Sequence, residues 1–188
     1  MRYSILKRLG DILAVLTLFV IISPLLIIIA LFIKFHDGGP IIFKQKRIGK
    51  DGNEFNFMKF RSMPVNTPNV VSTKTEVLEV TPIGKIIRRT NLDEIPQFIN
   101  VLKGDMSIIG PRPSLPSQAS LIAMRKQNGA IKLRPGLTGW AQVNAYDYMP
   151  EEEKACLDGV YYQKIGLVMD LVIVLGTIKY FTKKPPVY

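Results

Sequence analysis

Two adjacent carboxylates, Asp93 and Glu94, are the residues of this sequence best suited to chemistry. Pro96 follows them, and because proline is tolerated only in the first turn of a helix, both carboxylates are expected at a helix start. Unpaired backbone N–H groups and the helix dipole stabilise anions there, which favours a nucleophile or a metal ligand. The alternative is that they only cap the helix, since both residue types are favoured at such positions.

Three cations on stiff supports favour chemistry over capping. Lys59 follows two aromatic residues of the same parity in a predicted strand, so all three share one face. Arg88 lies near the end of a predicted helix, and Arg112 is held between two prolines. A carboxylate pair among fixed cations suits phosphate handling with a divalent metal ion.

The rarest residues exclude several other kinds of chemistry. His36 is the only histidine and Cys156 the only cysteine. Serine–histidine–aspartate catalysis, a metal site with several histidines, a cysteine-based zinc site and a disulfide framework are therefore excluded. The 188 residues suit one domain plus what its termini add, and the formal net charge of +10 fits a membrane surface or another anionic partner.

An apolar segment near the N-terminus predicts membrane insertion. Residues 12–33 are 22 consecutive uncharged residues, which as a helix would extend about 33 Å, enough for the hydrocarbon core of a bilayer. A cleaved signal peptide is the alternative, but the run is long for one and no small-residue cleavage site follows it.

Pro24 bears on whether this segment crosses the membrane. It leaves the carbonyl of Val20 without its helical partner, although the hydroxyl of Ser23 can bond back to Val20 or Phe19. Cations flank the run on both sides, so both ends are expected on the cytoplasmic face. A re-entrant helix-break-helix satisfies both flanks, whereas a kinked span satisfies one, and the residues alone leave both open.

The elements expected after this segment are short. A β-hairpin is predicted over 41–61, a polar loop over 62–80 and a helix starting at Thr81-Pro82. Arg61 shares the face of Lys59 and is interpreted as a solvent or lipid-phosphate contact. A second short helix over about 93–103 should end at Gly104.

The C-terminal part is predicted to contain more helices than strands. An extended connector over 105–117, a helix over 118–130 and a tight loop over 133–144 precede a helix that starts after Pro150. The apolar stretch 165–181 is expected to lie at the membrane interface, because a second span would bury Asp170, which is interpreted as structural. The fold class is therefore α+β, with a membrane segment, a small hairpin and short amphipathic helices at the cytoplasmic membrane face.

Several ordered motifs together resemble a known family. They are Lys7-Arg8 with Asp11, Ser23-Pro24, KFRSM at 59–63, Arg88 through Gln97, NVLKGDMSIIGPRP at 100–113, RPGLTGWAQVN at 134–144, and Tyr161-Tyr162 with Asp170. Over essentially the whole chain these motifs are similar to the small monotopic phosphoglycosyl transferases. These bacterial sugar transferases initiate glycan assembly, for example of capsule, O-antigen, exopolysaccharide or glycoprotein, on polyprenyl phosphate.

The resemblance implies a re-entrant membrane helix over 1–36, with its lead-in, and a cytoplasmic catalytic domain with interfacial helices over 37–188 on the bacterial inner membrane. It implies a UDP-sugar donor, undecaprenyl phosphate as acceptor, membrane lipid as a partner, Mg²⁺ as cofactor and no nucleic acid. Asp93 would attack the β-phosphorus of the donor, expel UMP and form a phosphosugar-aspartyl intermediate. Glu94 would help to hold the metal or manage the proton of the acceptor.

The resemblance also suggests which residues bind the donor. Lys59, Arg88 and Arg112 would bind its phosphates. Gln142 and Asn144 could read the uracil or the sugar through their amides, or could instead satisfy loop backbone groups. The stretch KFRSMPVNTPNV gives a weak hint of N-acetylated 6-deoxy sugars. The sequence does not determine the donor sugar, the glycan pathway or whether the chain forms a homo-oligomer.

Two other functions are kept as hypotheses. A non-enzymatic basic membrane adaptor that binds anionic lipid or nucleic acid would explain the charge, but not the stiff proline-containing elements around Asp93 and Arg112. A glycosyl transferase that uses the same carboxylates would release UDP rather than UMP, so the identity of the product separates the two enzymes.

Overall fold

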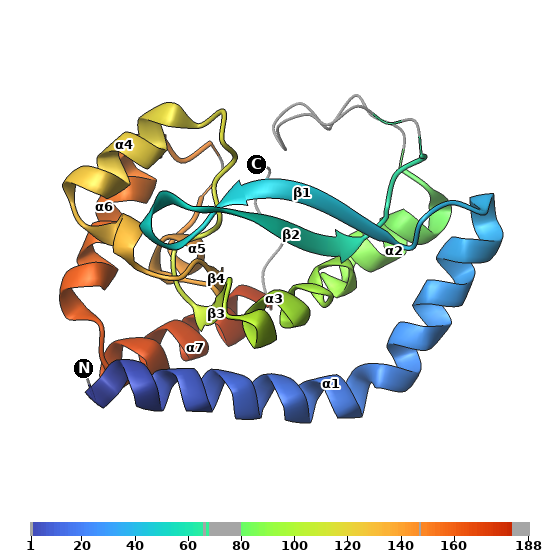
Figure 1. Cartoon of the computed structure of the whole chain (residues 1–188), viewed down its shortest axis with the longest axis horizontal. Helices are drawn as coiled ribbons and strands as arrows, with labels where there is room; N and C mark the ends of the chain where they lie inside the picture. The colour runs from blue at the N-terminus through green and yellow to red at the C-terminus, as the bar shows by residue number, and fades with distance from the viewer. Residues whose placement is uncertain (1, 66, 68–79, 147, 182–188) are drawn as a thin grey trace.

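The computed structural model describes residues 2–65, 67, 80–146 and 148–181. It is an α+β structure in which one long helix, α1 (Arg2–Asp37), runs beneath a two-stranded hairpin and a set of shorter helices (Figure 1). Most of the predicted loop over 62–80, including residues 68–79, lies outside the described residues.

α1 is one continuous helix that changes direction along its length (Figure 1). Pro24 lies inside it, and the hydroxyl of Ser23 donates to the carbonyl oxygen of Val20 at 2.8 Å. That carbonyl is the one that Pro24 deprives of its helical partner, so the predicted compensation by Ser23 is present. The predicted break is therefore a bend within one helix. An 18-residue stretch of this helix has a mean hydropathy of 3.1, and by length and composition the helix could cross a membrane.

Both halves of α1 pack against the rest of the chain. In the first half Val15 is fully buried in a cluster with Phe57 and Val101. In the second half Ile29 and Ile33 are buried in another cluster with the hairpin and with α2 (Pro82–Arg89). The C-terminal half of α1 thus packs against the hairpin and α2.

The predicted hairpin is confirmed. β1 (Ile42–Ile48) and β2 (Glu54–Phe60) are antiparallel, with Phe43 opposite Lys59, and a 3₁₀ turn, η1 (Lys50–Gly52), joins them. Asp51 and Gly52 adopt left-handed conformations in that turn, which aspartate and glycine tolerate well. Phe55 and Phe57 point into the core, so the apolar face of β2 is fixed as the alternation predicts.

Two helix signals in the sequence are also confirmed. Thr81 caps α2, its hydroxyl accepting from the N–H of Gly84 at 3.0 Å, and Pro82 is the first residue of that helix. α3 (Gln97–Lys103) ends at Gly104, whose φ of 92° is the left-handed conformation expected of glycine there. The predicted start of this helix is wrong by a few residues, because Asp93 and Glu94 lie in a separate 3₁₀ turn, η3 (Leu92–Glu94).

The predicted tight loop over 133–144 is wrong in part. It contains β4 (Gly136–Thr138), which pairs in parallel with β3 (Ser107–Ile109), and a short helix, α5 (Trp140–Val143). A Cβ atom on Gly136 would lie 2.1 Å from the backbone nitrogen of Gly110, so these two glycines let the backbones approach each other.

The remaining helices lie toward the end of the molecule where α1 begins (Figure 1). They are α4 (Ala119–Gln127), a 3₁₀ turn η4 (Ala130–Lys132), α6 (Glu151–Lys164) and α7 (Leu167–Phe181). The hydroxyls of Tyr3 and Tyr161 and the ammonium of Lys7 all donate to the carboxylate of Asp170, at 2.6, 2.6 and 2.7 Å. Asp170 therefore joins α7 to α1, as its structural interpretation predicts.

Candidate functional site

The carboxylate pair is carried by η3, which lies between α2 and β2. Asn91 precedes it in a left-handed conformation that asparagine tolerates, with φ of 55°. This turns the chain sharply from the end of α2 into η3. Asp93 is 5% exposed and Glu94 is half-buried, so the two neighbouring side chains differ in environment.

The pKa of Asp93 is raised to about 6, first by burial and then by the negative charge of Glu94. The positive charges of Lys59 and Arg88 act in the opposite direction without cancelling these effects. The expectation that Asp93 is stabilised as an anion is therefore wrong in sign. At neutral pH most of Asp93 is still ionised, and an anion that is poorly solvated is a stronger base and nucleophile than one in water.

Glu94 behaves in the opposite way. Burial acts to raise the pKa of Glu94, but the charges of Arg112 and Lys59 outweigh it, so the pKa lies below its usual value. An Nη2 nitrogen of Arg112 lies 3.2 Å from Oε1 of Glu94. Two adjacent carboxylates whose pKa values are pushed apart are suited to two different roles.

All three predicted cations act on this pair. Lys59 comes from β2, Arg88 from the last turn of α2 and Arg112 from the connector that follows β3. Burial lowers the pKa of the Lys59 ammonium, the charge of Asp93 opposes that effect, and the charge of Arg88 adds to it. The structure therefore brings together five of the predicted site residues: Lys59, Arg88, Asp93, Glu94 and Arg112.

A second cation from the hairpin, Arg47, joins them, and the sequence analysis did not select it. Arg47 of β1 lies over the ring of Phe57, 5.3 Å from its centroid, and donates to the carbonyl oxygen of Pro113 at 3.2 Å. The pKa of Arg47 is lowered to about 10, first by burial and then by the positive charge of Arg112. The negative charge of Glu94 opposes this change. Arg47 thus adds positive charge to the side of the site where Arg112 lies.

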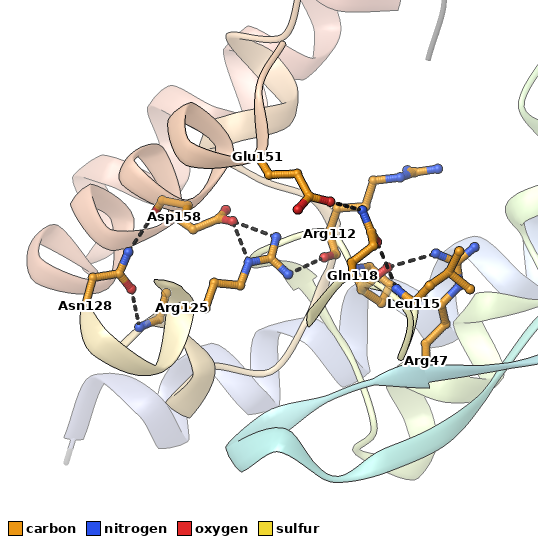
Figure 2. A network of polar contacts seen from close by, with 11 residues as sticks. Arg47, Arg112, Leu115, Gln118, Arg125, Asn128, Glu151 and Asp158 are labelled. Carbon is orange, nitrogen blue, oxygen red and sulfur yellow. Dashed lines mark hydrogen bonds and ion pairs between the residues drawn. The ribbon is translucent and has the colours of Figure 1, made fainter. Parts of the chain in front are cut away.

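The main chain at Arg112 is held by a buried ion pair (Figure 2). Arg125 of α4 donates from Nη1 to the carbonyl oxygen of Arg112 at 2.9 Å, and its Nε and Nη2 lie 2.8 and 2.6 Å from Oδ2 of Asp158 in α6. Arg125 is 5% exposed and Asp158 is 1% exposed. The side chain of Arg112 extends away from this pair in Figure 2, so the pair fixes the backbone of Arg112 while its guanidinium reaches Glu94.

The sequence carried a signal for this support that was not used. Arg125 lies four residues after Leu121, and both are the buried residues of α4. A charged residue at an apolar helical position needs a buried partner, and Asp158 supplies it from the facing side of α6.

The side chains of Gln142 and Asn144 donate hydrogen bonds to backbone carbonyl groups. The Nε2 of Gln142 donates to the carbonyl oxygen of Leu137 at 3.2 Å, and the Nδ2 of Asn144 donates to that of Trp140 at 2.8 Å. These bonds fit the second of the two roles considered for these residues. The Oε1 of Gln142 is buried and has no hydrogen-bond partner among the described residues.

Arg61 differs from its prediction as a solvated cation. It is 7% exposed, and its guanidinium lies where a side chain on Gly39 would otherwise be, with an Nη1 atom 2.0 Å from the position of a Cβ there. Arg61 therefore packs beneath the connection between α1 and β1, and Gly39 leaves the room it needs.

The carboxylate pair also fits a magnesium ion that would be shared with a substrate. The described residues contain no group of three or more aspartate, glutamate, histidine or cysteine side chains arranged for a metal. Mg²⁺ is commonly held by one or two carboxylates together with substrate phosphates and water. Asp93 and Glu94 match that donor set, and the cations around them match the phosphates.

Comparison with known proteins gives a consistent picture. The sequence profile of the family described as bacterial sugar transferase matches residues 2–184. The chain is 40% identical over 183 residues to the UDP-glucose:undecaprenyl-phosphate glucose-1-phosphate transferase of Escherichia coli (strain K12), a match that covers 93% of this chain and 39% of the relative.

Two further relatives are informative. The UDP-N-acetylgalactosamine-undecaprenyl-phosphate N-acetylgalactosaminephosphotransferase of Aeromonas hydrophila is 37% identical, over 94% of this chain and 44% of the relative. An uncharacterized sugar transferase of Bacillus subtilis (strain 168), EpsL, is 35% identical, over 93% of this chain and 86% of the relative. The chain thus spans about two fifths of the length of the E. coli and A. hydrophila relatives, and most of the length of EpsL.

Proposed function

The chain belongs to the bacterial sugar transferase family, and on that basis we propose that it transfers a sugar 1-phosphate from a UDP-sugar to undecaprenyl phosphate and releases UMP. One observation carries this proposal: a buried Asp93 with a raised pKa lies beside an ionised Glu94, and the charges of Lys59, Arg88 and Arg112 act on the pair. The names of the E. coli and A. hydrophila relatives describe the same type of reaction.

In the proposed first step, an Oδ of Asp93 attacks the β-phosphorus of the donor. A bond forms between this oxygen and phosphorus, and the bond from phosphorus to the oxygen that bridges the two phosphates breaks. UMP leaves with the electron pair, and Asp93 carries the phosphosugar. In the second step, a phosphate oxygen of undecaprenyl phosphate attacks the same phosphorus and releases the Asp93 carboxylate. The difficult transfer is thereby divided into two easier ones.

The cations bind and orient the donor in this account. Arg112 and Arg88 would contact its phosphate oxygens, since guanidinium groups match phosphate geometry, and Lys59 would add a localised charge beside Asp93. Glu94 and Asp93 are the residues that would hold Mg²⁺. When bound, Mg²⁺ would neutralise the charge that builds up on the departing UMP.

We also propose a re-entrant arrangement of α1, with residues 1–36 forming the membrane helix and its lead-in and residues 37–188 the catalytic domain on the cytoplasmic face. The packing of both halves of α1 supports this. Val15 and Ile33 are both buried against the same domain, at 0% and 2% exposure. A straight span would carry the second half of the helix away from that domain, and would leave Ile29 and Ile33 without these partners.

The identity of the released nucleotide tests the proposed function. Purified full-length chain would be incubated with Mg²⁺, undecaprenyl phosphate and single UDP-sugars, including UDP-glucose and UDP-N-acetylgalactosamine. Chromatography should detect UMP and a sugar diphosphate lipid. Release of UDP would instead indicate glycosyl transfer, and the absence of turnover with every donor, together with lipid binding, would favour a non-enzymatic adaptor.

A further inference from the structure

A second basic cavity lies away from Asp93. Its volume is about 180 Å³, and it opens between the start of α1, the hairpin turn and the chain around η4. Five cations and one carboxylate are among its lining residues: Lys7, Arg8, Lys50, Lys132, Arg134 and Asp11. Because ligand pockets for molecules the size of a nucleotide sugar are typically about 300 Å³ or more, this cavity suits a smaller anion.

Two of these cations are held by hydrogen bonds to uncharged acceptors. Arg8 donates to the carbonyl oxygens of Val101 and Leu102 at 2.6 and 3.0 Å, and Arg134 donates to that of Gly104 at 2.9 Å. All three acceptors are uncharged and belong to the C-terminal end of α3. Each guanidinium has five N–H donors, so within the described part of the chain most of them are not used by these bonds.

Arg8 and Arg134 are also close enough to repel each other. Burial lowers the pKa of Arg8, and the positive charge of Arg134 lowers it further, while the charge of Asp11 acts in the opposite direction. Asp11 is itself engaged by the hydroxyl of Ser107 at 2.6 Å. Two fixed guanidinium groups near each other in a partly buried cavity attract an anion with several oxygens, because such an anion can bond to both.

The surroundings of the cavity indicate where such an anion would come from. Ile165, which lines the cavity, is exposed, and it is followed on α7 by the strongly exposed Leu167 and Val168. On α1 the residues next to Lys7 and Arg8 include the exposed Leu6 and Leu9. Lys7, which is ion-paired with Asp170 of α7, and Arg8 thus lie next to exposed apolar residues of two helices. This arrangement is expected where a protein meets the headgroups of a bilayer.

We propose that this cavity binds the phosphate of an anionic membrane lipid, at a site separate from the carboxylate pair. Lys50 belongs to the hairpin turn, whereas Lys59 lies five residues into β2, roughly 17 Å along the strand from its start. The cavity and the Asp93 site thus lie toward opposite ends of the hairpin. The lipid would hold the N-terminal part of α1 and α7 at the bilayer surface, and this role does not depend on the proposed reaction.

Lipid binding by the full-length chain in detergent micelles tests the proposal without any turnover. The probes are short-chain phosphatidylglycerol, short-chain phosphatidylcholine and inorganic phosphate, each titrated by calorimetry. Phosphatidylglycerol should bind most tightly, because it offers both the anionic phosphate and acyl chains. Inorganic phosphate binding as tightly would overturn the lipid as the source, and equal binding of phosphatidylcholine would overturn recognition of the anionic charge.

Matched variants separate the cavity from general charge attraction. Lys50→Glu with Lys132→Glu changes two exposed residues of the cavity, and Lys103→Glu with Lys126→Glu makes the same change in net charge at exposed positions outside its lining. The first pair should weaken phosphatidylglycerol binding by about tenfold or more, and the second pair by less than about threefold. Equal weakening by both pairs would overturn the proposal. Lys132→Ala, the mildest change, should weaken binding in the same direction if the double variant does not fold.

Discussion

The guanidinium of Arg125 donates a hydrogen bond to the main-chain carbonyl oxygen of Arg112, 2.9 Å away, and is itself ion-paired with the buried carboxylate of Asp158. The buried pair of α4 and α6 therefore positions the backbone of Arg112, whose side chain contacts Glu94 of η3. The two helices that supply the pair, α4 and α6, contribute none of the five clustered site residues themselves. Their contribution to the site is to fix the connector that carries Arg112.

The first prediction concerns this support. Asp158→Asn should leave Arg125 buried without a countercharge and lower the free energy of unfolding by about 3 kcal/mol. The control is the exposed ion pair between Lys46 and Glu54, whose charged atoms are 3.9 Å apart. Lys46→Ala should change the free energy of unfolding by less than about 1 kcal/mol. Thermal unfolding in detergent followed by circular dichroism compares the two variants. Similar melting temperatures for both would show that the buried pair is not a structural support.

The second prediction uses two neighbouring arginines at the end of α2. Arg88 is half-buried and its charge acts on Asp93, whereas Arg89 is exposed. Removing a charged phosphate contact costs about 2 to 3 kcal/mol, so Arg88→Ala should lower kcat/KM for the UDP-sugar by about 30- to 150-fold. Arg89→Ala has the same change in charge and size and should lower it by less than about threefold. Equal losses in steady-state assays would mean that only the net charge of α2 matters.

The third prediction follows from the raised pKa of Asp93. Because only the carboxylate can attack, the rate of UMP release in the absence of acceptor should fall as the pH drops through about 6, by about tenfold per unit below it. An aspartate with its ordinary pKa would keep its rate down to about pH 4. Omitting the acceptor matters, because its phosphate titrates near the same pH.

Glu94→Gln refines that measurement. Glu94 is the second cause of the raised pKa of Asp93, so removing its charge should shift the acid limb of the rate profile to lower pH. The shift can be read from any residual rate, even where the variant is slow. A rate that stays constant from pH 5 to pH 8 in the unmodified chain would contradict the assignment of Asp93 as the attacking group.

The fourth prediction concerns the path of α1 through the membrane. Ser4→Cys and His36→Cys place single thiols at exposed positions near the two ends of the helix, in a Cys156→Ala background because Cys156 is itself exposed. A membrane-impermeant thiol reagent should label both from the cytoplasmic side of oriented vesicles. Pro24→Ala restores a partner for the carbonyl of Val20 and should shift some molecules toward a straight span. Labelling of the two positions from opposite sides would refute the re-entrant arrangement.

Local signals in the sequence predicted the elements that are fixed by local physics. Thr81-Pro82 and Gly104 mark helix ends because capping and left-handed conformations depend on one or two residues. The pairing of β3 with β4 was missed, since three-residue strands give no periodicity and the pairing depends on Gly110 and Gly136 meeting across 26 positions of the chain. Long-range approach of this kind leaves only scattered glycines in the sequence.

Five of the predicted site residues lie together in the structure, but the electrostatics of the cluster were not predicted. Residue types and stiff supports were enough to select Asp93, Glu94 and Arg112, because phosphate chemistry needs charges that do not move. The direction of the pKa shift at Asp93 was not predictable, since it depends on how far the folded chain buries that side chain. Arg125 was missed because its partner lies 33 residues away, on another helix.

The most direct test of the account is a single turnover without acceptor. Full-length chain with Mg²⁺ and a UDP-sugar that it accepts should release UMP in an amount close to that of the protein and then stop, because the phosphosugar stays on Asp93. Mass spectrometry should find the added mass of the phosphosugar on the peptide that contains Asp93. Asp93→Asn, which is nearly isosteric but a poor nucleophile, should give neither the burst nor the adduct. UMP release that occurs only when undecaprenyl phosphate is present, or turnover by Asp93→Asn close to that of the unmodified chain, would contradict the covalent role of Asp93.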